Sequence, residues 1–269
     1  MKILHLSDLH LNAGWLAWAS AQAHSYDLVC VSGDLLDMFS RKGHFWGVLA
    51  IKDWAEKFPA KLALCSGNHD ANSPDRIPDT GLLHLLEGAR RREAERLILL
   101  ERWMDSLEGP SVVTDNRTQL VETASGHVLV TTIPYSFIDW QPRKDLWKTG
   151  QKLRKETRLP WIVLHHEPPG GMLVGGHFGS SGVRAMIERY QPDFVLSGHM
   201  HLQPYRGDFA ERLGKTWCFN PGSPEEVAAA SAQTPNHIVL NLAAGTAAWC
   251  FSKAGKSSME TRVIRLVSS

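Results

Sequence analysis

Carboxylate, imidazole and amide side chains recur in this sequence directly after short apolar runs. Five such clusters follow one another along the chain: "DLH" (8–10), "GD" (33–34), "GNHD" (67–70), "HHEPP" (165–169) and "GHMH" (198–201). These side chains are the ligands that divalent first-row metals such as Mn, Fe, Co and Zn take in proteins. The set is larger than one ion needs, and it suits two ions about 3.5–4 Å apart that share a bridging carboxylate. The residue types therefore predict a two-metal site.

The spacing within the clusters supports this interpretation. In "DLH" and in the last three residues of "GHMH", strand alternation sends the outer two side chains the same way, so both can reach one metal cluster. The glycines before Asp34, Asn68 and His199 permit tight turns and close backbone approach. A lone D-x-H occurs by chance in a chain of 269 residues, and "GD" alone carries no information. "GNHD" and "GHMH" are much rarer, and the ordered set of five is specific.

The apolar runs before the clusters read as strands. They are "KILHLS" (2–7), "DLVCVS" (27–32), "KLALCS" (61–66), "WIVLHH" (161–166) and "DFVLS" (193–197). Their length and Val, Ile and Leu content are typical of strands buried on both faces. Helical patterns separate several of them, which predicts a layered α/β fold. Because the carboxyl ends of such strands line the ligand crevice, we expect the polar clusters to meet at one edge.

Two further regions differ from this alternation. Residues 81–108 read as a long amphipathic helix or a helical pair, so we expect one domain over 1–269 with a helical insert near 78–108. The basic cluster Arg90–Arg92 in that insert is interpreted as a solvated helix face, with a face toward substrate or nucleic acid as the alternative. The runs "TWCFN", "HIVLNL", "TAAWCFS" and "METRVIRLV" predict a more antiparallel C-terminal portion.

Composition narrows the class of protein. Hydrophobic residues make up 43% and charged residues 21%, and the formal charge is +1, so the chain reads as globular with no overall attraction to nucleic acid or membrane. The four cysteines form no CxxC pair, which favours buried free thiols in a reducing compartment. The first ten residues become polar too early for a signal peptide, and no apolar run reaches membrane-span length. We therefore expect a cytoplasmic protein that does not span a membrane.

The ordered motifs resemble those of the calcineurin-like metallophosphoesterase superfamily, whose pattern is D-x-H, GD, GNH(E/D), H and GHxH. The resemblance covers about residues 1–223, because "FNPGSP" (219–224) is similar to a turn that is common after the last motif. It implies a four-layer αββα sandwich with a dinuclear metal site. It also implies two divalent ions chosen from Mn²⁺, Fe²⁺, Zn²⁺, Co²⁺ and Ni²⁺.

The same resemblance implies a role for each motif residue. The first ion would be held by Asp8, His10 and His201. Asp34 would bridge the two ions. The second ion would be held by Asn68, His199 and one of the adjacent histidines His165 and His166. His166 is favoured because relatives often place this ligand two residues before a proline, here Pro168.

His165 would then contact the phosphate, act as the alternative ligand or pack in the sheet. His69 would approach the leaving-group oxygen, and Asp70 would either orient His69 or close the turn. Asp37 stands where purple acid phosphatases carry a tyrosine that binds ferric iron, which favours two divalent ions over the redox-active variant.

These features predict a metal-dependent phosphoester hydrolase in which water, activated by the two ions, attacks phosphorus. We expect a phosphodiesterase, with phosphomonoesterase activity as a further possibility and a phosphate ester as the partner. A DNA-processing nuclease of the same superfamily is the alternative, although the near-zero charge argues against nucleic acid. A non-catalytic scaffold on this fold is disfavoured, because such chains tend to lose metal ligands and here the full set is present.

Overall fold

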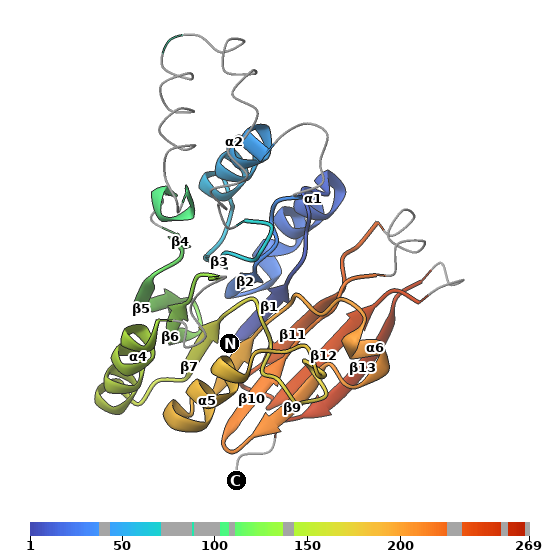
Figure 1. The fold of residues 1–269 in the computed structure, drawn as a ribbon. Coiled ribbons are helices and arrows are strands. Elements are labelled where there is room, and N and C mark those ends of the chain that lie inside the picture. Colours follow the sequence, from blue (N-terminus) through green and yellow to red (C-terminus); the bar gives the residue numbers. More distant parts are fainter. Residues whose placement is uncertain are drawn as a thin grey trace.

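The structure is a computed structural model that describes residues 1–37, 44–70, 88, 103–107, 111–136, 143–224, 233–253 and 258–266. Within these residues the strands form two mixed sheets packed face to face. Figure 1 shows α1 and α2 on one side of the sheets and α4 and α5 on the other. The predicted four-layer αββα sandwich is therefore confirmed.

The first sheet has seven described strands in the order β13-β12-β11-β1-β2-β3-β4. Its parallel part consists of β1 (Lys2–Leu6), β2 (Leu28–Ser32), β3 (Leu62–Cys65) and β4 (Val112–Val113). Its antiparallel part adds β11 (His237–Asn241), β12 (Thr246–Phe251) and β13 (Glu260–Arg265). The predicted antiparallel character of the C-terminal portion is thus confirmed for these three strands.

The second sheet has six described strands in the order β5-β6-β7-β8-β10-β9. It opens with an antiparallel hairpin of β5 (Arg117–Thr123) and β6 (Gly126–Thr132). Its centre runs parallel through β6, β7 (Trp161–Leu164), β8 (Phe194–Leu196) and β10 (Thr216–Phe219). The antiparallel strand β9 (Ala210–Leu213) pairs with the outer side of β10.

Helices cover the outer faces of both sheets. The first sheet is covered by α1 (Ala13–Gln22), the 3₁₀ turn η1 (Ala23–Ser25), α2 (His44–Glu56) and the 3₁₀ turn η4 (Trp103–Ser106). The second is covered by α4 (Lys144–Thr157) and α5 (Ser181–Tyr190), and the short α6 (Gln203–Arg206) precedes β9. α1 begins where the Asn12 side chain accepts a hydrogen bond from the Trp15 amide, a standard N-cap.

Among the residues that the structure describes, the apolar side chains form three cores that match this layering. One lies between the sheets, and each of the others lies between a sheet and its helices. Cys30 and Cys65 belong to the core between the sheets, and Cys218 is buried beneath α5. All four cysteines are free, and Cys250 on β12 is only partly buried.

Some predictions fall largely outside the described residues. Of the insert predicted near 78–108, the structure describes Gly88, which is helical, and residues 103–107. The cluster Arg90–Arg92 lies outside the described residues. Among the described helices none is long and apolar enough to cross a membrane. The assignment of residues 1–269 to one domain and the cytoplasmic location stay predictions.

Candidate metal centre

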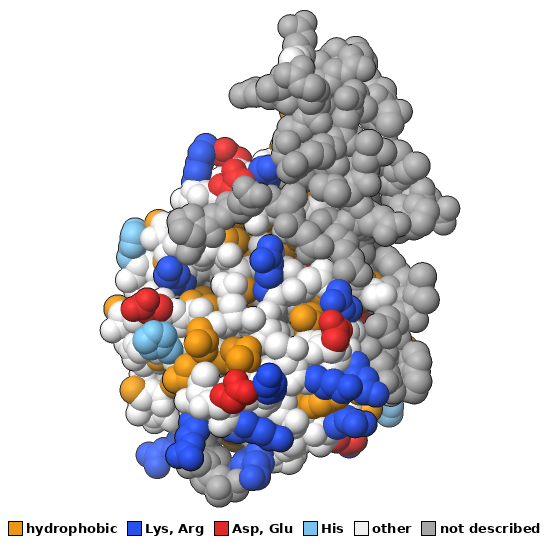
Figure 2. Space-filling model, turned by 90° about the vertical axis from the view of Figure 1, so that its left-hand side faces the viewer, with side chains coloured by type: hydrophobic (Ala, Val, Ile, Leu, Met, Phe, Trp, Pro, Cys, Tyr) orange, Lys and Arg blue, Asp and Glu red, His pale blue; other side chains and the backbone are white. Residues whose placement is uncertain are grey.

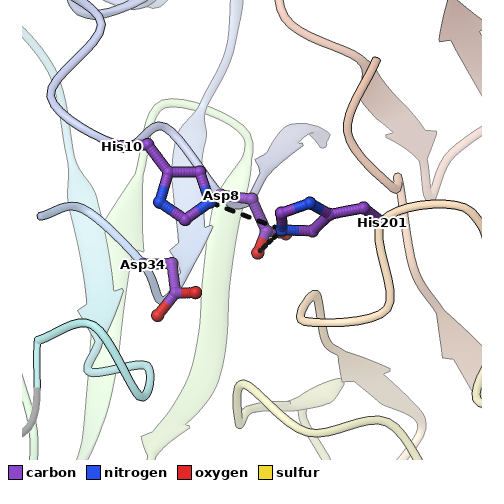
Figure 3. Close-up of side chains that lie close together, drawn as sticks. All are labelled: Asp8, His10, Asp34 and His201. Carbon is purple, nitrogen blue, oxygen red and sulfur yellow. Dashed lines mark hydrogen bonds and ion pairs between the residues drawn. The ribbon is translucent and has the colours of Figure 1, made fainter. Parts of the chain in front are cut away.

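Among the described residues, side chains of types that can ligate a metal converge from four strand-end loops at the carboxyl edge of the two sheets. Asp8, His10, Asp34 and His201 form one group, and Asp34, His166 and His199 form a second. Within each group, one potential ligand atom of every residue lies within 4.8 Å of the others. Figure 3 shows the first group, with the Asp8 carboxylate between the His10 and His201 rings and dashed lines from His201 to both residues. Asp34 belongs to both groups, so the two donor sets adjoin.

The loops after β1 and β2 continue to pair beyond the strands. The amide of Asp8 donates to the Gly33 carbonyl at 3.1 Å, and the amide of His10 donates to the Asp34 carbonyl at 2.9 Å. These bonds hold an unusual backbone, because φ is 55° at Asp8, 45° at His10 and 52° at Asp34. A left-handed non-glycine residue costs roughly 1–3 kcal/mol and persists only where its surroundings hold it. The backbone is therefore strained at the residues that face the candidate site.

Glycines make the close approach of these loops possible. A Cβ on Gly67 would lie 2.1 Å from Asp34 Oδ1, and a Cβ on Gly198 would lie 1.7 Å from Ser7 Oγ and 2.7 Å from Asp8 Oδ2. Only a residue without a side chain fits such positions. The predicted need for glycine before Asn68 and His199 is confirmed by these distances.

The first donor group suits a cation. His201 Nε2 lies 3.1 Å from Asp8 Oδ1 and 3.4 Å from His10 Nε2. Asp8 Oδ2 is buried and has no hydrogen-bond partner among the described residues. Burial alone would raise the pKa of Asp8, but the neighbouring His201, His166 and His10 hold it well below its usual range. An ionised carboxylate with an orphan oxygen beside two imidazoles is a donor set that a divalent ion completes.

A backbone carbonyl orients His166 in the second donor group. His166 Nδ1 donates to the Ser32 carbonyl at 2.8 Å, and this bond turns Nε2 toward Asp34 Oδ2 at 3.2 Å and Asn68 Oδ1 at 3.1 Å. His199 Nδ1 lies 2.9 Å from the same Asn68 oxygen. A hydrogen bond on the far ring nitrogen is the usual way in which a protein orients a metal-binding histidine. Both donor groups therefore fit divalent ions.

The adjacent histidines have different surroundings. His166 lies in the second donor group, whereas His165 Nδ1 is 3.2 Å from the Ile133 carbonyl and its Nε2 is 4.0 Å from Glu167 Oε2. Burial opposes protonation of His166, but Asp34 beside it raises its pKa to about 10. Of the two alternatives that the sequence leaves open, the structure brings His166 toward Asp34.

His69 and Asp70 also differ in what they contact. His69 lies beside the shared carboxylate: its amide donates to Asp34 Oδ1 at 2.9 Å and its Nε2 is 3.8 Å from Asp34 Oδ2. Burial lowers the pKa of His69, and the Asp34 and Asp37 charges oppose that effect. The Asp70 carboxylate accepts hydrogen bonds from the amides of Gly67, Leu35 and Leu36, an arrangement that closes the turn.

Two residues near the site have no assigned role in the sequence motifs. The Tyr135 ring centroid lies 6.1 Å from that of His166 and 6.4 Å from that of His199. Burial raises the pKa of Tyr135 to about 12. Tyr135 lies just after β6, at the carboxyl edge of a parallel strand. This position is the feature by which the sequence could have identified it. The other is Ser32, which acts through its backbone carbonyl, so no residue-type pattern reveals it.

Residues 1–203 match the family model described as "Calcineurin-like phosphoesterase". A search of curated proteins gives no significant match.

Several solved structures share the fold. One is a protein from Thermus thermophilus, 15% identical, with 99% of each chain covered and a TM-score of 0.52. A purple acid phosphatase from yellow lupin is 12% identical, covers 98% of this chain and 53% of its own, and has a TM-score of 0.51. A putative 5'-nucleotidase from Staphylococcus aureus is 12% identical, covers 100% of this chain and 54% of its own, and has a TM-score of 0.50.

At these identities the structural likeness shows the fold alone, whereas the family model covers most of the chain. Together with the two adjoining donor groups, it shows that this chain belongs to the calcineurin-like phosphoesterase family and is a metal-dependent phosphoester hydrolase.

Proposed function

We propose that this protein is a phosphodiesterase with two divalent ions side by side at the carboxyl edge of its sheets. The observation that carries the proposal is that Asp34 belongs to both donor groups. Asp8, His10 and His201 would hold the first ion, and Asp34 would be shared by the two ions. Asn68, His166 and His199 would hold the second ion.

The ions, when bound, supply activated water near neutral pH and neutralise the phosphate oxygens. The chain supplies the remaining chemistry. His69 lies beside Asp34 and its side chain is 12% exposed, so one edge of the ring is accessible to a substrate. Because burial lowers the pKa of His69, its ring is neutral near pH 7 and its N–H stabilises the charge that develops on the leaving oxygen.

The proposed preference for a diester depends on open space beside the first donor group. The His201 side chain is 41% exposed although it reaches Asp8 at 3.1 Å, so solvent has access beside the first donor group. A second ester substituent would occupy such an opening. Tyr135 borders the opposite, second-ion side, where its ring can contact the substrate.

A substrate panel tests this proposal. Metal-stripped protein is reconstituted separately with Mn²⁺, Fe²⁺, Co²⁺, Ni²⁺ or Zn²⁺ and assayed on bis-p-nitrophenyl phosphate, p-nitrophenyl phosphate, a cyclic nucleotide and single-stranded DNA. We expect bis-p-nitrophenyl phosphate and the cyclic nucleotide to be hydrolysed with a higher kcat/KM than p-nitrophenyl phosphate or single-stranded DNA, and a chelator to abolish turnover. Faster hydrolysis of the monoester would make the protein a phosphatase, and activity on none of the four would favour a non-catalytic scaffold.

A second candidate, a nuclease, has one structural feature in its favour. Helix α4 lies on the side of the molecule shown in Figure 2, where basic side chains gather in the lower part of the face. Lys148, Lys152, Lys155 and Arg158 of this region are exposed. A row of exposed cations suits a phosphate backbone, and binding through it weakens steeply with salt.

The variant Lys148→Glu/Lys152→Glu/Lys155→Glu separates the two candidates. If the protein is a nuclease, this variant loses DNA cleavage while it keeps hydrolysis of bis-p-nitrophenyl phosphate. If DNA is a poor substrate and the variant behaves like the wild type on every ester, the basic face of α4 is an ordinary solvated helix surface.

A further inference from the structure

The chain leaves the metal centre at Asp70 and returns to the described core at Trp103. The indole Nε1 of Trp103 donates a hydrogen bond to the Asp70 backbone carbonyl at 3.0 Å. Both residues are buried, Trp103 at 1% and Asp70 at 2% exposure. Trp103 also packs with Met104 and Leu107 in the core between the first sheet and its helices. Asp70 is thus fixed from the protein interior by a side chain 33 positions away.

Asp70 in turn fixes the loop that carries Asp34. Its Oδ1 accepts from the Leu36 amide at 2.8 Å, and its Oδ2 accepts from the amides of Leu35 at 3.2 Å and Gly67 at 2.9 Å. Hydrogen bonds from amides to a carboxylate are among the stronger ones in proteins. Leu35 and Leu36 directly follow Asp34, whose φ of 52° is left-handed. The Asp70 carboxylate therefore holds the chain where the strained Asp34 turn ends.

We propose that Trp103 is a positioning residue of the metal centre, acting through Asp70 on the turn that presents Asp34 to both donor groups. The path runs from the indole N–H to the Asp70 carbonyl, from the Asp70 carboxylate to the Leu35 and Leu36 amides, and from there to Asp34. This inference rests on the proposed function, because it takes Asp34 as the shared ligand. It assigns Asp70 to positioning rather than to proton transfer.

Trp103 could instead act only as a large apolar side chain in its core, so the test must separate the N–H group from the ring. Trp103→Phe removes the donor and keeps an aromatic ring. Trp54→Phe is the matched control, because Trp54 packs against the same core and its indole donates to the Leu16 carbonyl at 3.2 Å and to Ser20 Oγ at 2.9 Å. Neither acceptor belongs to the donor groups.

Two measurements on metal-free protein give the readout. Amide hydrogen exchange by NMR at Leu35 and Leu36 reports whether the turn is held, and titration with Mn²⁺ or Co²⁺ by calorimetry gives the Kd of the site. We expect Trp103→Phe to speed exchange at the two amides and to weaken metal binding by roughly three- to tenfold each, the usual effect of one lost hydrogen bond. Trp54→Phe should leave amide exchange and Kd at wild-type values, while its melting temperature falls by about as much as that of Trp103→Phe.

A second variant tests the middle of the path. Asp70→Asn should change exchange and Kd in the same direction and by more, and the double variant with Trp103→Phe should be no worse than Asp70→Asn alone. Equal effects of Trp103→Phe and Trp54→Phe, or additive effects in the double variant, would overturn the proposal. If Trp103→Phe does not fold, unchanged exchange in Asp70→Asn overturns it.

Neither measurement uses a substrate, so the outcome is separable from the proposed activity. Wild-type protein that hydrolyses bis-p-nitrophenyl phosphate, with exchange and Kd unaffected by Trp103→Phe, would leave the function standing and remove the positioning role.

Discussion

At the scale of single residues, Asp34 is the described side chain that connects the two donor groups. It lies in both donor groups, its Oδ1 accepts the His69 amide, and its Oδ2 faces His166 Nε2. Burial would raise the pKa of Asp34, but His166 beside it lowers that pKa, so the carboxylate is ionised before any metal binds. Replacing Asp34 should therefore disturb ion binding and not only turnover.

This leads to a paired prediction for Asp34 and His69. Asp34→Asn keeps the shape of the side chain but removes its charge, so the protein should lose bound metal and turnover together. His69→Asn leaves both donor groups intact, so it should keep the metal and lose about 10²–10³-fold in kcat, the usual contribution of one hydrogen-bond donor to a developing negative charge.

Metal content by atomic emission, measured alongside kcat on a diester, checks both variants. Asp34→Asn that still binds two ions tightly would remove the bridging assignment. His69→Asn with near wild-type kcat would remove His69 from the leaving-group side.

The sequence predicts which residues meet better than it predicts what each one contacts. The ligand-type residues could be named because each follows a recognisable strand and because the ordered motifs match a family. The bonds of Asp70 to Leu35 and Leu36 could not, because they join two loops whose approach depends on how β2 and β3 pair. The position of Tyr135 similarly depends on β6, a strand without a polar cluster at its end.

At the scale of elements, the site depends on loops that approach one another closely at the carboxyl ends of parallel strands. Gly67 follows β3 and touches the Asp34 backbone of the loop after β2, where a Cβ would come within 2.5 Å of the Asp34 amide nitrogen. Close packing of this kind leaves no room for one added methyl group. The geometry of the Asp34 turn is therefore set jointly by two loops.

Gly67→Ala should accordingly push the Asp34 turn out of place. We expect more than tenfold weaker metal binding together with a loss of about 1–3 kcal/mol in the free energy of unfolding, the typical effect of overpacking. Calorimetric metal titration and urea unfolding measure the two effects.

Gly14→Ala in α1 is the control, because its Cβ would meet only Asn12 Oδ1 at 3.3 Å and alanine favours a helix. Metal binding in Gly67→Ala that equals the binding in Gly14→Ala would contradict the close-approach interpretation.

Element prediction succeeded for the five apolar runs before the polar clusters and missed the hairpin β5–β6 and helix α4, although the last five residues of β6 are buried. The five apolar runs before the polar clusters contain β1, β2, β3, β7 and β8, because strands covered on both faces require continuous apolar sequence. The hairpin β5–β6 and helix α4 were not predicted. Most of β5 is exposed and polar, and α4 buries only Leu146, Trp147 and Gly150. Because β5 and α4 bury few side chains, their sequences contain few apolar residues and show no clear apolar pattern.

At the scale of the whole molecule, burial of a neutral histidine beneath the site links stability to pH. His5 on β1 is fully buried, and its Nε2 lies 2.8 Å from Ser32 Oγ. Burial lowers the pKa of His5 to about 3, although the Asp8 charge opposes the shift. Below the ordinary histidine pKa of about 6.5, the unfolded chain binds a proton that folded His5 does not. The contribution of His5 therefore lowers the free energy of unfolding as the pH falls from about 6.5 toward 3.

The metal-free protein should lose about 2 kcal/mol in the free energy of unfolding between pH 6.5 and 5 from His5 alone. Burial also lowers the pKa of His199 to about 4, which acts in the same direction, whereas the raised pKa values of His166 (about 10) and Asp70 (about 7) act in the opposite direction. Comparison with His5→Gln isolates the His5 contribution, because the amide can still bond to Ser32 but does not titrate. Urea unfolding at the two pH values measures it, and equal losses in both proteins would show that another group is responsible.

The four thiols of the chain have one practical consequence. Burial raises the pKa of Cys30, Cys65 and Cys218, which keeps these three protonated and inaccessible, whereas Cys250 on β12 is partly exposed. Maleimide reagents need an accessible thiolate, so they should react at Cys250 first. The natural sequence thus already provides a single attachment point for a fluorophore or spin label, and no cysteine has to be added or removed.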